Sequence, residues 1–340
     1  MGEVADFVKE RISTDKLTLT TYVSTENMRS DFGGINPALS IPNNTNVIHY
    51  KKRDVLLSNI RPYLRKAWSA NYDGGCSADV FVFRAKHITP FFLYYIIAND
   101  TFINYVMSGA KGVKMPRGDK EQMLKYTFST PTMEEQNKIS HILHLLDDRI
   151  TTQNKIIDKL QSLIKGIAQN IVSNNKPNIR LSDCLDCSSS TLQESDVCET
   201  GIYPVYGANG IVGYLDNYNT EGEAVYIIKD GSGVGTVSYA TGKCSATGTL
   251  NTLQAKDGYS LQYLYYILKV FNFEPYKTGM AIPHIYFKDY GKAKIFCPSY
   301  TEQLRYARLQ SAIDSKLSVE KNILTSLSSQ KQYLLRQMFI

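Results

Sequence analysis

Clusters of lysine and arginine are the side chains in this sequence whose type and spacing best suit a chemical role. Within sixteen positions, six cations stand against a single acid, Asp54; they are Lys51, Lys52, Arg53, Arg61, Arg65 and Lys66. A second group lies in a stretch punctuated by Gly112 and Pro116; it comprises Lys111, Lys114, Arg117 and Lys120. Neutralising successive phosphates requires such local groups of cations rather than a high overall charge. These clusters therefore predict contacts with a nucleic acid.

Cationic side chains recur at the corresponding place in the second half of the chain, where Lys277 and His284 surround Gly279 and Pro283. Further candidates for phosphate contact in this half are Lys229, Lys243 and Lys288. Base edges are read by Arg against guanine and by Asn or Gln against adenine; the candidates for this role are Arg61, Arg65, Arg117, Asn209 and Asn251. For any single residue, the alternative is a solvated surface position. Similar groups in both halves favour DNA.

One glycine-rich stretch suggests a phosphate loop but does not meet the requirements of that motif. The stretch from Gly231 to Gly235 is followed by Lys243, yet the motif would need a glycine in place of Val237 and a serine or threonine in place of Cys244. The glycines therefore predict a turn that brings the backbone close to a surface.

Neither a metal centre nor a nuclease site is indicated. Cys184 and Cys187 have the spacing of a zinc-binding pair, but no second such pair follows, which favours free thiols. The Asp-x-Lys signature of nucleases occurs only at Asp314 and Lys316, inside a predicted helix. We expect a chain that is not an enzyme by itself and holds no cofactor.

An internal duplication determines which elements position these residues. The segment from Pro131 to Ile139 recurs from Pro298 to Tyr306, at an offset of 167 residues. The same offset relates three further pairs: Gly112 and Gly279, Pro116 and Pro283, and Asp147 and Asp314. Several matches in the same order indicate a duplicated fold rather than chance similarity.

Each copy begins with a globular part, residues 1–133 and 174–300. Short β-type runs occur at Val47–Tyr50, Asp79–Phe83, Ala224–Ile228 and Thr236–Tyr239. Each part also has one aromatic helical stretch, at Pro90–Val106 and Leu261–Phe271. This mixture predicts an α+β fold.

Each copy ends in a predicted long helix, residues 134–173 and 301–340. Seam positions alternate in steps of three and four; in the first helix they are Ile150, Gln153, Ile157, Leu160, Ile164, Ile167 and Ile171. The equivalent positions of the second are Leu317, Glu320, Leu324, Leu327, Lys331, Leu334 and Met338. So narrow a stripe is typical of a coiled coil, in which polar residues such as Glu320 and Lys331 fix the register. We expect two tandem pseudo-symmetric globular domains separated by two long antiparallel coiled-coil helices.

Length, hydropathy and charge exclude several classes of protein. A chain of 340 residues can form two domains, no apolar run is long enough to span a membrane, and the first twenty residues lack the apolar core of a signal peptide. We therefore expect a cytoplasmic protein. The net charge of +6 is uneven, because residues 1–133 hold 17 Lys and Arg against 12 Asp and Glu, whereas residues 174–300 hold 10 against 12.

The order of these features resembles that of a known family. Pro131-x-x-x-Glu135-Gln136 opens the first long helix, and Pro298-x-x-x-Glu302-Gln303 opens the second, each after a globular part rich in Gly and Tyr. Over essentially the whole chain, this looks like the specificity subunit of type I restriction-modification systems. The resemblance implies two target-recognition domains that each read one half of a bipartite double-stranded DNA site, spaced by the helices.

The resemblance also implies partners. The helices would dock two adenine-N6 methyltransferase subunits and, through them, ATP-dependent restriction and translocase subunits. S-adenosylmethionine, ATP and Mg²⁺ would then belong to those partners. Two alternatives stay open: a coiled-coil adaptor that binds only proteins, and a self-sufficient nuclease. Absence of salt-dependent DNA binding would favour the first, and cleavage by the chain with Mg²⁺ alone would favour the second.

Overall fold

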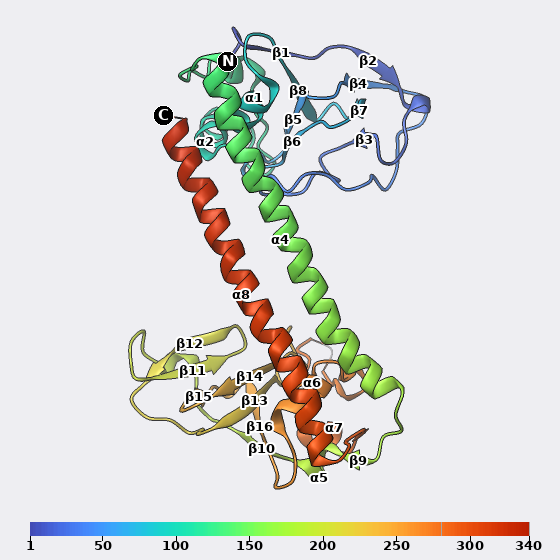
Figure 1. Cartoon of the computed structure of the whole chain (residues 1–340), viewed down its shortest axis with the longest axis vertical. Coiled ribbons are helices and arrows are strands. Elements are labelled where there is room, and N and C mark those ends of the chain that lie inside the picture. The colour runs from blue at the N-terminus through green and yellow to red at the C-terminus, as the bar shows by residue number, and fades with distance from the viewer. Residues whose placement is uncertain (280, 340) are drawn as a thin grey trace. The chain divides into compact units, whose positions relative to one another are not determined.

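The computed structural model describes residues 1–279 and 281–339, and the chain divides into two compact units. Unit 1 comprises Met1–Thr152 and the chain from Leu324 on, and unit 2 comprises Gln153–Ile323. Two long helices, α4 (Met133–Ser173) and α8 (Tyr300–Met338), contribute to both units (Figure 1). Each unit thus contains one globular part and a portion of each long helix.

Unit 1 contains two sheets. The first has the order β1-β8-β5-β6 with antiparallel neighbours; its strands are β1 (Ala5–Phe7), β5 (Val55–Ser58), β6 (Ala67–Ser69) and β8 (Val80–Ala85). The second has the order β2-β4-β7-β3; its strands are β2 (Arg11–Ser13), β3 (Tyr22–Val23), β4 (Asn46–Tyr50) and β7 (Gly74–Cys76). Because side chains alternate along a strand, Phe81 and Phe83 of β8 share a core with α1, whereas Val80 and Val82 pack in a separate core with Tyr50.

The expected helix Pro90–Val106 is wrong as a single element, because it is divided into α1 (Pro90–Ile97) and α2 (Asp100–Ser108). Asn99 lies between them in an extended conformation, and its side-chain oxygen accepts a hydrogen bond from the Thr101 amide at 3.0 Å. This is an N-cap, which starts a new helix. The remaining helical elements of this part are α3 (Lys120–Leu124) and two 3-10 turns, Thr14–Lys16 and Pro62–Leu64.

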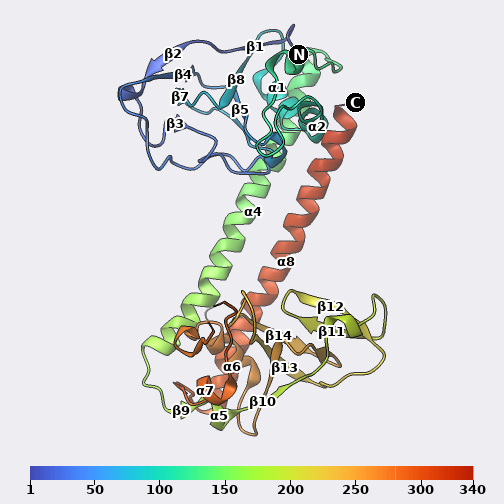
Figure 2. The same cartoon turned by 180° about the vertical axis from the view of Figure 1, so that it is seen from behind.

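Unit 2 repeats this architecture. Its main sheet has the order β10-β16-β13-β14, with strands β10 (Leu185–Ser189), β13 (Glu223–Ile228), β14 (Val237–Thr241) and β16 (Leu250–Ala255). A second sheet has the order β12-β11-β15, with strands β11 (Tyr203–Gly207), β12 (Gly210–Leu215) and β15 (Ser245–Ala246), and β9 (Ile179–Arg180) pairs with β17 (Lys294–Ile295). Helix α6 (Leu261–Leu268) packs on β13 and β14 (Figure 2). The short helices are α5 (Leu181–Cys184), α7 (Phe287–Tyr290) and the 3-10 turns Glu194–Asp196 and Glu274–Tyr276.

The predicted duplication recurs in individual hydrogen bonds. Buried Gln136 of α4 accepts from the Thr89 amide at 2.9 Å and donates to the Pro131 carbonyl at 3.0 Å. Gln303 of α8 makes the equivalent pair, with the Ser260 amide at 2.9 Å and the Pro298 carbonyl at 2.9 Å. The glutamine of each Pro-x-x-x-Glu-Gln segment therefore joins the start of a long helix to the start of the aromatic helix of the same unit.

A tyrosine and an aspartate make a second repeated contact. Tyr95 donates to Asp147 at 2.9 Å in unit 1, and Tyr266 donates to Asp314 at 2.8 Å in unit 2. Burial, followed by the neighbouring carboxylate, raises the pKa of both tyrosines above the ordinary value, so both hydroxyls stay protonated and remain donors. The two contacts fix each long helix against its globular part.

The long helices pair antiparallel within each unit, as expected. In unit 2, Gln153 donates to the backbone carbonyl of Glu320 at 3.0 Å and to its carboxylate, while Gln310 donates to the Ile164 carbonyl at 3.2 Å. Gln153 and Glu320 are equivalent positions of the two copies, so their contact is the one that helices paired about a twofold axis require. In unit 1, Lys331 contacts Asp147 at 2.5 Å. Both polar residues expected in the seam therefore have partners.

Candidate nucleic-acid interface

A turn and a hairpin lie side by side in unit 1 and bring two of the predicted cationic clusters together. The turn runs from Arg61 to Lys66, after β5, and the hairpin runs from Lys111 to Arg117. The hairpin is closed by two backbone hydrogen bonds between Lys111 and Arg117, both of 2.9 Å. The Arg61 amide donates to the Pro116 carbonyl at 2.8 Å, which joins the turn to the hairpin. We call this pair of loops frame 1.

Unit 2 contains the same arrangement, which we call frame 2. Its hairpin runs from Thr278 to His284 and is closed by backbone hydrogen bonds of 2.9 and 2.7 Å between these two residues. Its turn runs from Gly231 to Thr236, and the Gly231 amide donates to the Pro283 carbonyl at 3.0 Å. The stretch that resembled a phosphate loop is therefore a turn, as expected, and it corresponds to the arginine-rich turn of frame 1.

The two turns differ at positions where the backbone is left-handed. Gly231 and Gly235 have φ of 94° and 90°, and the equivalent positions of frame 1 are Arg61 and Arg65, with φ of 51° and 53°. A non-glycine residue in this conformation costs about 1 kcal/mol. Frame 1 therefore keeps two arginine side chains at positions where glycine would be less strained.

The side chains of these two arginines make different contacts. Arg65 contacts Asp31 at 2.7 Å and Asp100 at 2.8 Å, and its guanidinium lies 5.6 Å from the centroid of the Phe32 ring. Arg61 is exposed and makes no side-chain ion pair with any residue that the structure describes. Arg65 therefore holds neighbouring segments together, whereas Arg61 is available to a ligand.

The six cations between Lys51 and Lys66 do not form one patch. Lys51, Lys52 and Arg53 precede β5, and the other three follow it, so the two groups lie at opposite ends of this strand. Four residues at ~3.3 Å per residue separate the groups by ~13 Å. The tertiary structure instead joins the Arg61 turn to the hairpin that carries Lys114 and Arg117.

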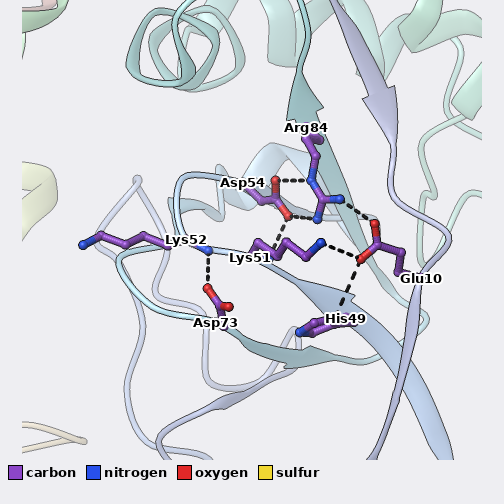
Figure 3. A network of polar contacts seen from close by, with 7 residues as sticks. All are labelled: Glu10, His49, Lys51, Lys52, Asp54, Asp73 and Arg84. Carbon is purple, nitrogen blue, oxygen red and sulfur yellow. Dashed lines mark hydrogen bonds and ion pairs between the residues drawn. The ribbon is translucent and has the colours of Figure 1, made fainter.

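A network of ion pairs holds the segment from Lys51 to Asp54 (Figure 3). Arg84 donates to the nearly buried carboxylate of Asp54 at 2.9 and 2.8 Å and contacts Glu10 at 2.7 Å. Glu10 also pairs with Lys51 at 3.2 Å. Hydrogen bonds from Arg84 and then Lys51 lower the pKa of Glu10, so this carboxylate stays ionised at neutral pH.

Lys52 takes no part in that network through its side chain. Its backbone amide donates to Asp73 at 2.7 Å, and its side chain points away from the carboxylates (Figure 3). Arg53, with φ of 77°, is also exposed. The network thus orients a short segment that presents two cations to solvent.

Many of the other predicted cations have partners within the protein. In the first half these are Lys51 with Glu10, Arg65 with two aspartates, Lys66 with the Thr25 carbonyl at 2.7 Å, Lys111 with Asp119 at 2.8 Å and Arg117 with Asp79 at 3.1 Å. In the second half they are Lys243 with Glu221 at 3.7 Å, Lys277 with Glu274 at 2.6 Å and His284 with Asp230 at 2.6 Å. The exposed candidates without a side-chain ion pair in the described part of the chain are Lys52, Arg53, Arg61, Lys114 and Lys288. Lys229 is half-buried.

Asn251 and Asn209, both proposed for base readout, differ in how far they are exposed to solvent. Asn251 is buried, donates to the Tyr290 hydroxyl at 3.0 Å and accepts from Ser189 at 3.1 Å, so it belongs to the core of unit 2. Asn209 is exposed between β11 and β12. Only Asn209 of this pair is accessible to a base.

Reasoning from charge missed the apolar residues at the hairpin tips. Val113 and Met115 in frame 1 and Ile282 in frame 2 are exposed. The signal that could have found them is the presence of apolar residues between the matching Gly and Pro of both copies.

The described residues show neither a metal site nor a disulfide. Across residues 1–279 and 281–339, no group of three or more His, Cys, Asp or Glu side chains could hold a metal ion. The cysteines of the described chain, including Cys184 and Cys187, are free thiols. No helix in the same ranges is long and apolar enough to cross a membrane.

Comparisons with known proteins place the chain among specificity proteins. A family model described as the type I restriction modification DNA specificity domain matches residues 4–162 and 177–329. The EcoDI specificity subunit of a type I restriction enzyme from Escherichia coli is 26% identical over 119 residues, which are 35% of this chain and 27% of the relative. A putative type I specificity subunit of Haemophilus influenzae, S.HindORF215P, is 34% identical over 89 residues, 25% of this chain and 23% of the relative. The matched segments thus span about a quarter of each relative.

Two solved structures share the fold. The S subunit of a type I restriction-modification system from M. genitalium superposes with a TM-score of 0.72 over 100% of this chain and 94% of its own, at 17% identity. A chain from a structure of complex assembly and conformational transition in a type I system has a TM-score of 0.55, covers 99% of this chain and 95% of its own, and is 19% identical. At these identities the likeness concerns the fold.

Proposed function

Since the chain belongs to the type I restriction modification DNA specificity family, we propose that it is the non-catalytic subunit that recognises DNA in a type I restriction-modification complex. Residues 1–133 and 174–300 are the two target-recognition domains, and each reads one half of a bipartite site in double-stranded DNA. Residues 134–173 and 301–340 are the spacer helices between them. The complex acts in the cytoplasm, the compartment that contains the DNA it recognises.

The observation that carries this proposal is the occurrence of the same loop frame in both units. A bipartite target needs two readers, and two hairpins with the same closing hydrogen bonds supply equivalent surfaces. The side chains on the two frames differ, with Arg61 and Arg65 in frame 1 at the positions of Gly231 and Gly235 in frame 2. Different side chains on one backbone frame suit two half-sites of different sequence, because base contacts specify and backbone contacts position.

Exposed apolar residues on the long helices support docking of the methyltransferase subunits. On α4 they include Ile142, Leu145, Ile156 and Leu163, and on α8 Leu309, Val319, Ile323 and Tyr333. Ile142 and Leu309, like Ile156 and Ile323, are equivalent at the offset of 167. These residues fall on a second stripe with steps of three and four, separate from the seam that pairs the helices. The stripe also includes polar residues such as Arg149 and Lys316. Its apolar members at equivalent positions of both helices offer a surface to two copies of one protein partner.

We assign the chemistry to those partners. Two methyltransferase subunits use S-adenosylmethionine, and restriction and translocase subunits use ATP and Mg²⁺. The chain itself supplies recognition, orientation and spacing.

The test is co-expression with the cognate methyltransferase subunit in a host without the system, followed by sequencing that detects N6-methyladenine. We expect methylation at one bipartite motif, and none when the methyltransferase is expressed alone. Ile156→Asp combined with Ile323→Asp should abolish methylation by placing charge on the docking stripe. The matched control is Asn154→Asp with Asn322→Asp, because both asparagines are exposed on the same helices off that stripe.

Absence of methylated motifs with the wild-type chain, together with no salt-dependent DNA binding by the complex, would instead establish a protein-binding adaptor. Loss of methylation in the asparagine control as well would show that added charge anywhere on the helices is disruptive. That outcome would contradict the assignment of the stripe as the docking surface.

A further inference from the structure

The tips of the two hairpins carry exposed apolar side chains at matching places. Val113 in the hairpin of frame 1 is fully exposed, and Met115 beside it is 47% exposed. In the hairpin of frame 2, Ile282 is 58% exposed. Single exposed apolar residues are ordinary on protein surfaces. Here they recur in the equivalent loop of both units, although the loop sequences differ.

The hairpin backbone holds these side chains outward. Paired hydrogen bonds close each hairpin. A further bond, from the Arg61 amide to the Pro116 carbonyl in frame 1 and from the Gly231 amide to the Pro283 carbonyl in frame 2, ties the hairpin to the adjacent turn. Gly279 has φ of 87°, and a Cβ atom there would lie 2.3 Å from the Ile282 carbonyl oxygen. The backbone at Gly279 is therefore tightly constrained, which limits the conformational entropy lost when the neighbouring Ile282 contacts a ligand.

The charge at the frame 1 tip favours DNA as that ligand. Lys114 lies between the two apolar residues of the frame 1 tip, is exposed, and makes no ion pair with any described residue. The cations at the hairpin bases are held by carboxylates, Arg117 by Asp79 at 3.1 Å and His284 by Asp230 at 2.6 Å. An apolar tip with a cation beside it matches a base step flanked by phosphates, whereas an apolar protein surface would leave Lys114 unpaired.

We propose that the two hairpins are wedges that insert between base pairs, Val113 and Met115 in the half-site read by frame 1 and Ile282 in the half-site read by frame 2. This rests on the proposed function and adds a mode of readout to it. Apolar side chains that enter a base step unstack it and bend the duplex, at a free-energy cost that depends on the step. Each half-site is then selected partly by how easily its DNA deforms at the wedge.

The experiment measures the affinity of the purified complex with its methyltransferase for duplexes of the methylated motif. Val113→Ser combined with Met115→Ser should weaken binding to the intact duplex about tenfold or more. For this double variant, a duplex with an abasic site at the wedge step should restore most of the wild-type affinity. The base step is then already unstacked, so binding no longer has to supply the free energy of unstacking. The abasic site is moved along the half-site to locate the step. Ile282→Ser should behave in the same way for the other half-site.

Leu39→Ser is the matched control, because Leu39 is 96% exposed in unit 1 outside the frame. It should bind both duplexes like the wild type, and the thermal unfolding of all variants should be unchanged, since only exposed side chains differ. If the tip variants bind intact DNA with wild-type affinity, the proposal of insertion is wrong, and the proposed function is unaffected. Weak binding that no abasic duplex restores would show a surface contact instead of insertion. Absence of site-specific binding by the wild-type complex would overturn both proposals.

Discussion

A cation that already pairs with a carboxylate has less to gain from a phosphate than one that faces only water, because part of its charge is neutralised in the free protein. Arg65 and Lys111 are of the first kind, and Arg61 and Lys114 are of the second. Arg61 also keeps a left-handed conformation that glycine adopts at the equivalent position of frame 2. A strained residue that makes no ion pair with any residue that the structure describes points to a role in binding.

Arg61→Gly should therefore stabilise unit 1 and weaken DNA binding. Removal of the backbone strain should raise the free energy of unfolding by up to about 1 kcal/mol, whereas Arg61→Ala keeps the strain and should not. Both variants should lower affinity for all DNA sequences and reduce the salt slope by about 1 if Arg61 contacts a phosphate. Thermal unfolding and salt titrations of the complex check the two effects. Equal stability of both variants would contradict the assignment of strain to Arg61. Unchanged affinity for DNA would show that Arg61 is a solvated surface residue without a role in binding.

Among the elements, the two long helices are joined to their globular parts by the same glutamine. Gln136 and Gln303 are almost fully buried, at 1% and 2% exposure, and each satisfies one backbone amide and one backbone carbonyl. A buried amide or carbonyl without a partner costs about 1–3 kcal/mol. The Pro-x-x-x-Glu-Gln segment is therefore a structural joint, and its repetition follows from the need to fix both helices.

Gln136→Leu should lower the free energy of unfolding by about 2–3 kcal/mol, because it leaves the Thr89 amide and the Pro131 carbonyl unsatisfied. Gln161→Leu is the control, since Gln161 is exposed on the same helix, and it should change stability by less than about 0.5 kcal/mol. Chemical denaturation of the full chain measures both. Equal effects of the two substitutions would show that the hydrogen bonds of Gln136 do not hold the joint.

For the whole molecule, duplication supplies two globular parts with the same loop frame and different surface side chains. The first globular part carries 17 cations against 12 acids, and the second carries 10 against 12. The two globular parts therefore differ in charge balance, because the first has an excess of cations and the second a slight excess of acids. The two long helices, which contact each other through Gln153 and Glu320, are each divided between the two units.

If the paired helices set the spacing, lengthening both should lengthen the target. Seven residues inserted after Gln153 in α4 and seven inserted before Glu320 in α8 keep the seam in phase and face each other. They add ~10 Å at 1.5 Å per residue, which corresponds to about three base pairs at 3.4 Å each. Methylome sequencing should then show the same half-sites with an unspecified spacer about three base pairs longer. An unchanged spacer would show that the helices do not measure the distance.

The sequence by itself determined the features that depend on spacing along the chain. The offset of 167, the helices near residues 134–173 and 301–340, their seam and the turn from Gly231 to Gly235 all follow from local patterns, because backbone conformation and helical periodicity are set by neighbouring residues. The break at Asn99 was missed, because the apolar pattern continues through a residue that caps a second helix.

Only the tertiary structure decided which cationic side chains are exposed and which pair with carboxylates. Glu10 neutralises Arg84 and Lys51 from distant positions in the chain, Asp79 holds Arg117, and β5 separates two cationic groups that are adjacent in sequence. The junction of the Arg61 turn with the hairpin, and the exposure of Val113, likewise depend on contacts between remote segments. Burial and ion pairing are properties of the folded chain, and no local spacing encodes them.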